Sequence, residues 1–138
     1  MKKVFISLVS CLMALGSFAA ELDIMPNYSA DLCWSGASMS GNTATWQEAW
    51  GGLVFNLENK DYSAYDYVVV DFAEPTTAKL KLEAYYSDSN TAGSYCEVEA
   101  GAKQVKLDLD ASQQSNIQKI AIMSAKAASA TITKAVLT

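Results

Sequence analysis

The residues best suited to chemistry in this chain are tryptophans that stand next to glycines. Trp50 precedes Gly51-Gly52, and Trp34 precedes Ser35-Gly36. Rings placed at turns are hard to bury completely, and exposed indole faces often contact a flat, partly apolar ligand. Planar polar side chains nearby could form hydrogen bonds to such a ligand. Both tryptophans could instead close the end of a β-sandwich without touching a ligand.

Strand periodicity extends this candidate site to further aromatic and polar residues. Tyr85 and Tyr95 are out of phase with their apolar neighbours, so their rings should face away from a core. Asn56 is out of phase with its apolar neighbours too, whereas Trp46 shares a strand face with Ala44, which leaves core packing open for Trp46. The complete set of candidate ligand-binding residues is Trp50, Trp34, Trp46, Tyr85, Tyr95, Gln47, Asn56 and Glu83.

Catalysis is disfavoured by the residue types present. The chain contains no histidine, which excludes Ser-His-Asp and Cys-His arrangements and any histidine-ligated metal site. Glu97 and Glu99 share one strand face and could in principle form a glycosidase pair. Alternating acids are more typical of a solvated strand, so we expect no enzyme and keep a small glycosidase as the least favoured alternative.

Charge and acid spacing limit the possible partners. The net charge is −5, and it becomes −7 when Lys2 and Lys3 are left out. Such a chain repels phosphate backbones and anionic lipid, so we expect neither nucleic-acid binding nor membrane insertion. No cofactor is expected. Structural calcium could be held by Asp108 and Asp110, or near Asp23 and Asp31, although no calcium-loop spacing occurs.

Short apolar segments with period-2 alternation predict an all-β fold. In the clearest case Leu80, Leu82, Ala84 and Tyr86 face one way, and Lys79, Lys81, Glu83 and Tyr85 face the other. About nine such segments with turns between them predict an antiparallel β-sandwich. Asp61–Tyr65 could form one helical turn capped by Asp61. The expected strands are 31–34, 43–46, 53–57, 67–72, 79–86, 95–99, 104–109, 119–124 and 130–137.

The first twenty residues predict a signal peptide that is cleaved near Ala19 or Ala20. Lys2 and Lys3 precede a short apolar run and a small-x-small pattern at Ser17–Ala19. One domain, residues 21–138, would then be secreted. The alternative is a lipoprotein anchored through Cys11.

Signal removal would leave Cys33 and Cys96 as the remaining cysteines. An even pair in an exported protein favours one disulfide bond between them. Two unpaired thiols are the alternative, because sequence spacing does not prove proximity.

The run from Asp61 to Pro75 has the pattern D-x-S-x-Y-D-x-V-V-V-x-F-x-E-P and follows Trp50-Gly51-Gly52. It resembles non-catalytic carbohydrate-binding modules attached to endoglucanase-type glycoside hydrolases of gut and rumen Bacteroidetes. The resemblance implies a galactose-binding-like jelly roll, a monomer that works beside a fused or associated hydrolase. The implied ligand is a plant β-glucan such as cellulose, mixed-linkage glucan or xyloglucan. A cell-surface structural or protein-interaction sandwich without a glycan site is the alternative.

Overall fold

A computed structural model describes residues 20–138. The predicted signal peptide, apart from Ala20, and the alternative lipid anchor at Cys11 lie outside the described residues. Within residues 20–138 no helix has the length and apolar character needed to cross a bilayer. The strands are β1 (Leu22–Asp23), β2 (Ala37–Ser40), β3 (Thr43–Trp46), β4 (Gly52–Lys60), β5 (Tyr67–Phe72), β6 (Leu80–Tyr86), β7 (Ser94–Val98), β8 (Gln104–Asp108), β9 (Ile117–Ser124) and β10 (Ala128–Leu137).

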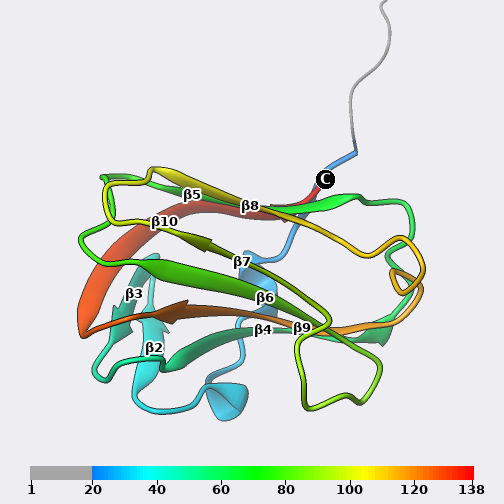
Figure 1. Ribbon diagram of the computed structural model, residues 1–138, viewed down its shortest axis with the longest axis horizontal. Coiled ribbons are helices and arrows are strands. Elements are labelled where there is room, and N and C mark those ends of the chain that lie inside the picture. The colour runs from blue at the N-terminus through cyan, green and yellow to red at the C-terminus, as the bar shows by residue number, and fades with distance from the viewer. Residues whose placement is uncertain (1–19) are drawn as a thin grey trace, which may run out of the picture.

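These strands form two antiparallel sheets that face each other (Figure 1). One sheet has the order β2-β3-β10-β5-β8, with β1 paired to β10; the other has the order β4-β9-β6-β7. Strand β10 pairs with β3 through its first half and with β5 through its second half, with a bulge between Ile132 and Lys134. The predicted antiparallel, jelly-roll-like sandwich is confirmed, with ten strands where about nine were expected.

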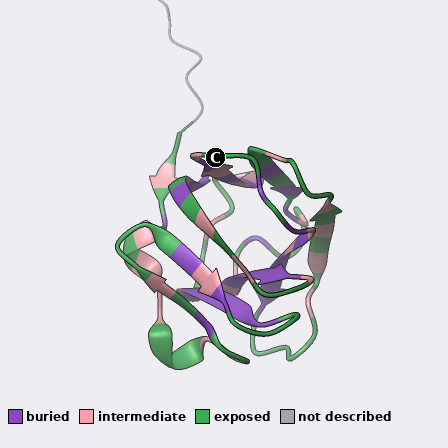
Figure 2. Cartoon of the chain, turned by 90° about the vertical axis from the view of Figure 1, so that its left-hand side faces the viewer, coloured by how far each residue is buried: buried purple, intermediate pink, exposed green. Residues whose placement is uncertain are grey.

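The core fills the space between the two sheets. In β6 the side chains of Leu80, Leu82, Ala84 and Tyr86 belong to the main buried cluster, as the alternation predicted. Lys81, Glu83 and Tyr85 therefore lie on the outer face of the same sheet. Figure 2 shows the buried residues concentrated on the strands and the exposed residues on the connecting loops.

The segment before β2 departs from the sequence prediction. Residues Ala30–Leu32 form a short 3₁₀ helix, and of the predicted strand 31–34 only Trp34 pairs with a sheet, through one bridge to Gly52. The cause is local hydrogen bonding, because the Leu32 and Cys33 N–H groups donate to the Ser29 and Ala30 carbonyls, three residues earlier. Strands β1 and β2 were not predicted, since β1 has two residues and β2 is rich in serine.

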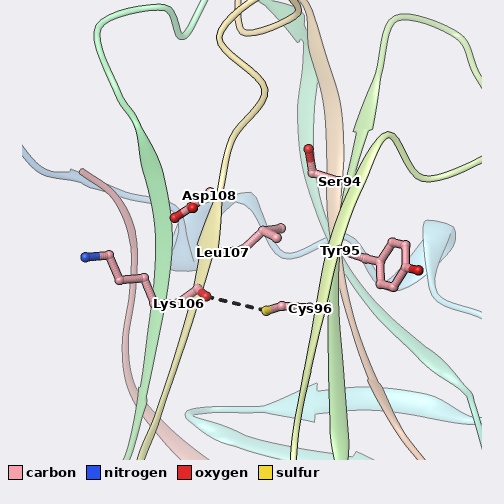
Figure 3. Close-up of a pocket in the computed structure, with 6 residues that line it drawn as sticks. All are labelled: Ser94, Tyr95, Cys96, Lys106, Leu107 and Asp108. Carbon is pink, nitrogen blue, oxygen red and sulfur yellow. Dashed lines mark hydrogen bonds between the residues drawn. The ribbon is translucent and has the colours of Figure 1, made fainter.

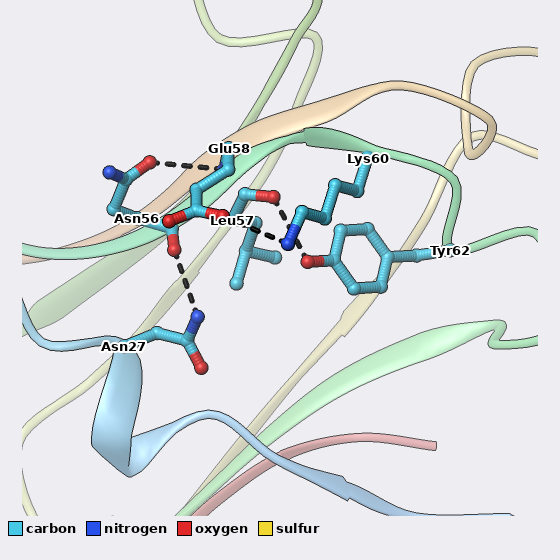
Figure 4. A network of polar contacts seen from close by, with 6 residues as sticks. All are labelled: Asn27, Asn56, Leu57, Glu58, Lys60 and Tyr62. Carbon is cyan, nitrogen blue, oxygen red and sulfur yellow. Dashed lines mark hydrogen bonds and ion pairs between the residues drawn. The ribbon is translucent and has the colours of Figure 1, made fainter.

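The Asp61–Tyr65 segment forms a turn, and the predicted helical turn is wrong. The Tyr65 N–H donates to the Tyr62 carbonyl at 3.0 Å. The Asp61 carboxylate accepts hydrogen bonds from the Ser63 N–H and hydroxyl at 2.9 and 2.6 Å, as expected of a capping residue. The Tyr62 hydroxyl donates to the Leu57 carbonyl at 2.9 Å and so ties the turn to the end of β4 (Figure 4).

The predicted disulfide between Cys33 and Cys96 is wrong. Both thiols are free. Cys33 lies against β4, where its Sγ accepts from the Val54 N–H at 3.3 Å, and Cys96 lies in β7. Strands β4 and β7 are the two opposite edges of one sheet. Three strand spacings separate them, about 14 Å, whereas a disulfide joins Cα atoms at most about 7 Å apart.

Candidate functional site

The outer face of the β4-β9-β6-β7 sheet gathers most of the candidate residues. Strand pairing places Val54, Ala121, Glu83 and Tyr95 in one row across the four strands. A second row holds Asn56, Lys119 and Tyr85. We call this surface, with Trp34 at its β4 edge, the aromatic face; its members are Trp34, Gly52, Val54, Asn56, Lys81, Glu83, Tyr85, Tyr95, Glu97, Lys119, Ala121 and Met123.

Trp34 lies flat against the β4 edge of the aromatic face. Its indole N–H donates to the Trp50 carbonyl at 3.0 Å, and its backbone pairs with Gly52. The ring packs against a small apolar cluster that contains Val54 and Ala121, both fully buried although they face outward. Trp34 itself is half-buried. The sandwich therefore holds this ring in one position at the edge of a sheet surface.

Trp50 lies in the turn before β4, at the end of the same sheet. Its backbone adopts a φ of 63°, a left-handed conformation that is uncommon outside glycine. Its N–H donates to the Ser124 carbonyl at the end of β9, at 2.6 Å. The side chain is 43% exposed, so the prediction of an exposed ring beside glycine agrees with the structure.

Tyr95 is the most exposed aromatic ring on the aromatic face. It is 63% exposed, in line with its predicted outward phase. The Lys81 ammonium lies 4.6 Å from the centre of the Tyr95 ring and 3.2 Å from the Glu83 carboxylate. A cation above a tyrosine face is an attractive arrangement, and the same ammonium can donate to a ligand placed on the ring.

Tyr85 and Glu83 face outward as predicted, but they are buried. They are 8% and 7% exposed. The Tyr85 hydroxyl donates to Glu83 Oε1 at 2.6 Å. Burial, followed by this bond to the Glu83 carboxylate, raises the pKa of the Tyr85 phenol. The expectation that Tyr85 is an exposed platform for a sugar is therefore wrong: its ring instead supports Lys119, whose ammonium lies 4.6 Å from the ring centre.

Two other candidate residues lie away from the aromatic face. Trp46 is 1% exposed, and its indole N–H donates to the Ile122 carbonyl at 3.0 Å inside the core. The prediction that Trp46 binds the ligand is therefore wrong, because its ring lies on the inner side of β3, in the core. Gln47 follows β3 in the other sheet, where it is exposed and its N–H donates to the Gly36 carbonyl.

Sequence reasoning missed the lysines of this face. Lys81 is in the same outward phase as Glu83, a sign that was present in the alternation of β6. Lys119 directly precedes the apolar run of β9 and lies between the Tyr85 and Trp34 rings, at 4.6 and 5.6 Å from their centres. The lysine beside an apolar run was the available signal. It was not sufficient, because the residues around Lys119 come from β4, β6 and the segment before β2.

The acids considered for calcium are engaged elsewhere or isolated. Asp110 accepts three hydrogen bonds from Ser112 and Gln113, which lower the pKa of its carboxyl. Asp23 accepts from the Met25 N–H at 2.9 Å. Within residues 20–138 no group of three or more metal-ligating side chains comes together.

A cleft of about 370 Å³ lies between the neighbouring edges β7 and β8 (Figure 3). Ser94, Cys96 and Leu107 line it, and the Cys96 Sγ lies 3.5 Å from the Lys106 carbonyl oxygen. Tyr95 points out of the opposite side of β7 (Figure 3). This cleft is the open side of the sandwich, and it lies on the other side of β7 from the Tyr95 ring.

No protein family matches the chain by its sequence, and no curated protein does. Solved structures do match its fold. A low-affinity xylan-binding module of the CBM86 group from Roseburia intestinalis has a TM-score of 0.63 at 11% identity, covering 86% of this chain and 93% of that one. A family 11 carbohydrate-binding module from Clostridium thermocellum, in complex with a β-1,3-1,4-mixed-linked tetrasaccharide, has a TM-score of 0.60 at 15% identity, covering 88% and 96%. A mannan-recognising module, TmCBM27, has a TM-score of 0.53 at 11% identity, covering 86% and 95%.

These structures define the class of fold to which the chain conforms. It has the jelly-roll β-sandwich of non-catalytic carbohydrate-binding modules, as the Asp61–Pro75 motif implied. At these identities the likeness concerns the fold alone.

Proposed function

We propose that this protein binds a plant cell-wall polysaccharide on its aromatic face and does not cleave it. The observation that carries the proposal is the combination of exposed rings and polar groups on one sheet surface. Tyr95 and Trp34 lie on opposite edges of that surface, about 14 Å apart by strand count, with Lys81 and Lys119 between them. Trp50 extends the aromatic character at the end of the sheet.

Sugar recognition needs ring stacking and hydrogen bonds, and the aromatic face offers both. Tyr95 presents a ring to which the C–H groups of a pyranose can pack. The Lys81 ammonium beside it can donate to a hydroxyl while Glu83 holds it in place. Because Tyr95 and the Lys81–Glu83 pair are set on strands, their side chains lose little conformational freedom on binding. Affinity should still be modest, since few rings take part.

A β-linked backbone, β-glucan first and xylan second, is the ligand class we propose. Support comes from the resemblance of Asp61–Pro75 to modules of endoglucanase-type enzymes. It also comes from structural neighbours, of which one binds xylan and another holds a mixed-linkage glucan fragment. The charged and apolar start of the chain supports a place outside the cytoplasm, where the module would raise the concentration of a hydrolase on its substrate.

Affinity electrophoresis in gels that contain β-glucan, xylan or mannan tests the proposal. Tyr95→Ala and Trp34→Ala should each reduce retardation by β-glucan or xylan. Tyr67→Ala is the matched control, because Tyr67 lies on the outer side of the other sheet beneath Lys106. Absence of retardation in every gel would reject the proposal and favour a protein-interaction sandwich. Equal loss in all three variants would place the site elsewhere.

A further inference from the structure

The charges on the aromatic face are not evenly neutralised. Three lysines lie on this side of the sheet. Lys79 pairs with Glu97 at 3.0 Å, and Lys81 pairs with Glu83 at 3.2 Å. No carboxylate of residues 20–138 lies within 4.0 Å of the Lys119 ammonium, which instead rests between the Tyr85 and Trp34 rings. The Lys119 ammonium is thus partly buried between two aromatic rings, and it has no carboxylate partner among residues 20–138.

Asn56 adds donors beside this cation. It is the β4 residue in register with Lys119. Its Oδ1 accepts the Glu58 N–H at 3.0 Å, which leaves the amide nitrogen as the free end of the side chain. Figure 4 shows this nitrogen pointing away from the contacts of Glu58 and Asn27. Lys119 and Asn56 therefore present two donor groups on this face, an ammonium and an amide N–H₂ group.

A carboxylate is a better acceptor for the Lys119 ammonium and the Asn56 amide than a hydroxyl group is. A carboxylate accepts several hydrogen bonds and gains from the positive charge. A hydroxyl offers a weaker acceptor and must place its own proton. In a chain of net charge −5, a polymer with a charge on every sugar would be repelled. One unpaired cation matches one isolated carboxylate on an otherwise neutral polymer.

We infer that the aromatic face recognises a β-linked polysaccharide that carries sparse uronic-acid side groups, and that Lys119 with Asn56 binds the sugar carboxylate. This inference rests on the proposed function, because it assigns the ligand of the same face. Lys119 is then a specificity-determining residue. Tyr95 and Trp34 serve any β-linked backbone, charged or neutral.

Matched polymers test the inference. The first pair is glucuronoxylan and the same glucuronoxylan after its carboxyl groups have been reduced to alcohols. The second is lightly carboxymethylated β-glucan and the unmodified polymer. We expect the carboxylate-bearing member of a pair to bind about two- to fivefold more tightly, the range expected of a partly exposed ion pair. Raising the salt concentration should remove this preference and leave binding of the neutral member unchanged.

Three lysine variants separate a local effect from a general charge effect. Lys119→Gln should make the two members of each pair bind equally, and Lys119→Arg should preserve the preference. Lys106→Gln is the matched control, because Lys106 also lies over a tyrosine, at 3.9 Å from the Tyr67 ring centre, but on the other sheet. It changes the net charge equally and should leave the preference intact.

The outcomes are distinct for the two proposals. Equal binding of both members of each pair by the wild type overturns this inference and leaves the proposed function standing. An equal loss of preference in Lys119→Gln and Lys106→Gln also overturns it, because long-range charge would then be the cause. Failure of all four polymers to bind overturns the proposed function and this inference with it.

Discussion

The Trp34 indole lies directly on the backbone of Gly52. A Cβ atom added to Gly52 would stand 2.4 Å from two carbons of the Trp34 ring and 2.5 Å from a third. Such distances are far below van der Waals contact, so only glycine allows the ring to lie here. The Gly51-Gly52 pair thus serves the close approach of Trp34 as well as the turn that carries Trp50.

Gly52→Ala should displace Trp34 and weaken glycan binding. The new methyl group overpacks the contact, and we expect a loss of about 1–3 kcal/mol in the free energy of unfolding. A double-mutant cycle with Trp34→Ala in urea denaturation checks the cause. In the Trp34→Ala background Gly52→Ala should cost little, because the clashing ring is gone. An unchanged cost in that background would show that the backbone, not the ring, requires glycine.

Trp46→Ala should reduce stability, whereas Trp50→Ala should reduce glycan binding. Trp46 is buried and hydrogen-bonded within the core, so its loss should cost about 3–5 kcal/mol of stability. Trp50 is 43% exposed, and its hydrogen bonds with Ser124 and Trp34 use only its backbone. Trp50→Ala should therefore leave the melting temperature nearly unchanged and reduce retardation in a β-glucan gel. A large drop in melting temperature for Trp50→Ala would contradict its assignment as a surface ring.

Both cysteines should react as free thiols. When a protein of residues 20–138 is unfolded without reductant, maleimide should label both Cys33 and Cys96. In the folded protein labelling should be slow, because burial is the main cause that raises the pKa of each thiol and so reduces the thiolate. A reductant should not alter the melting temperature. Unlabelled cysteines after unfolding would show that a disulfide had formed.

Two turn carboxylates should contribute to loss of stability in acid. Hydrogen bonds from Ser63 lower the pKa of Asp61, and bonds from Gln113 and Ser112 lower the pKa of Asp110. Because the pKa of each carboxyl is lower in the folded state, its contribution to stability is fully present at pH values above the unfolded-state pKa, which is near 3.8. This contribution is lost as the pH falls through the folded pKa.

The Asp61→Asn/Asp110→Asn variant should therefore lose less stability than the wild type between about pH 5 and pH 2. Urea denaturation at several pH values measures this difference. Asp31→Asn/Glu74→Gln removes the same charge from two exposed acids that make no side-chain hydrogen bond or ion pair with residues 20–138. It should keep the wild-type acid response, and a parallel change in both variants would assign the effect to net charge.

Much of the fold could be predicted because strand alternation is a local property. The pattern of 79–86 correctly separated the core side of β6 from its outer side. Strands β3 and β5 have the predicted bounds. The Asp61–Pro75 motif correctly implied a jelly roll, since it contains β5 and the turn that enters it. Strand β1 could not be found in this way, because two residues carry no periodicity.

The candidate site was only partly predictable, because alternation does not reveal what covers a face. Tyr85 points outward as expected, but Trp34 and the apolar cluster around Val54 leave it buried. Trp46 points inward although its neighbours in the sequence left that open. The distance between Cys33 and Cys96 was likewise decided by strand order, because Cys33 lies against β4 and Cys96 lies in β7, at opposite edges of one sheet.

The sequence by itself determined an all-β sandwich, an acidic chain without histidine and tryptophans placed beside glycines. Those properties follow from composition and from contacts between residues close together in the chain. Only the tertiary structure decided which rings remain exposed and that Lys119 lies unpaired between Tyr85 and Trp34. These features depend on residues brought together from β4, β6, β9 and the segment before β2, whose spacing in the sequence carries no information about their proximity.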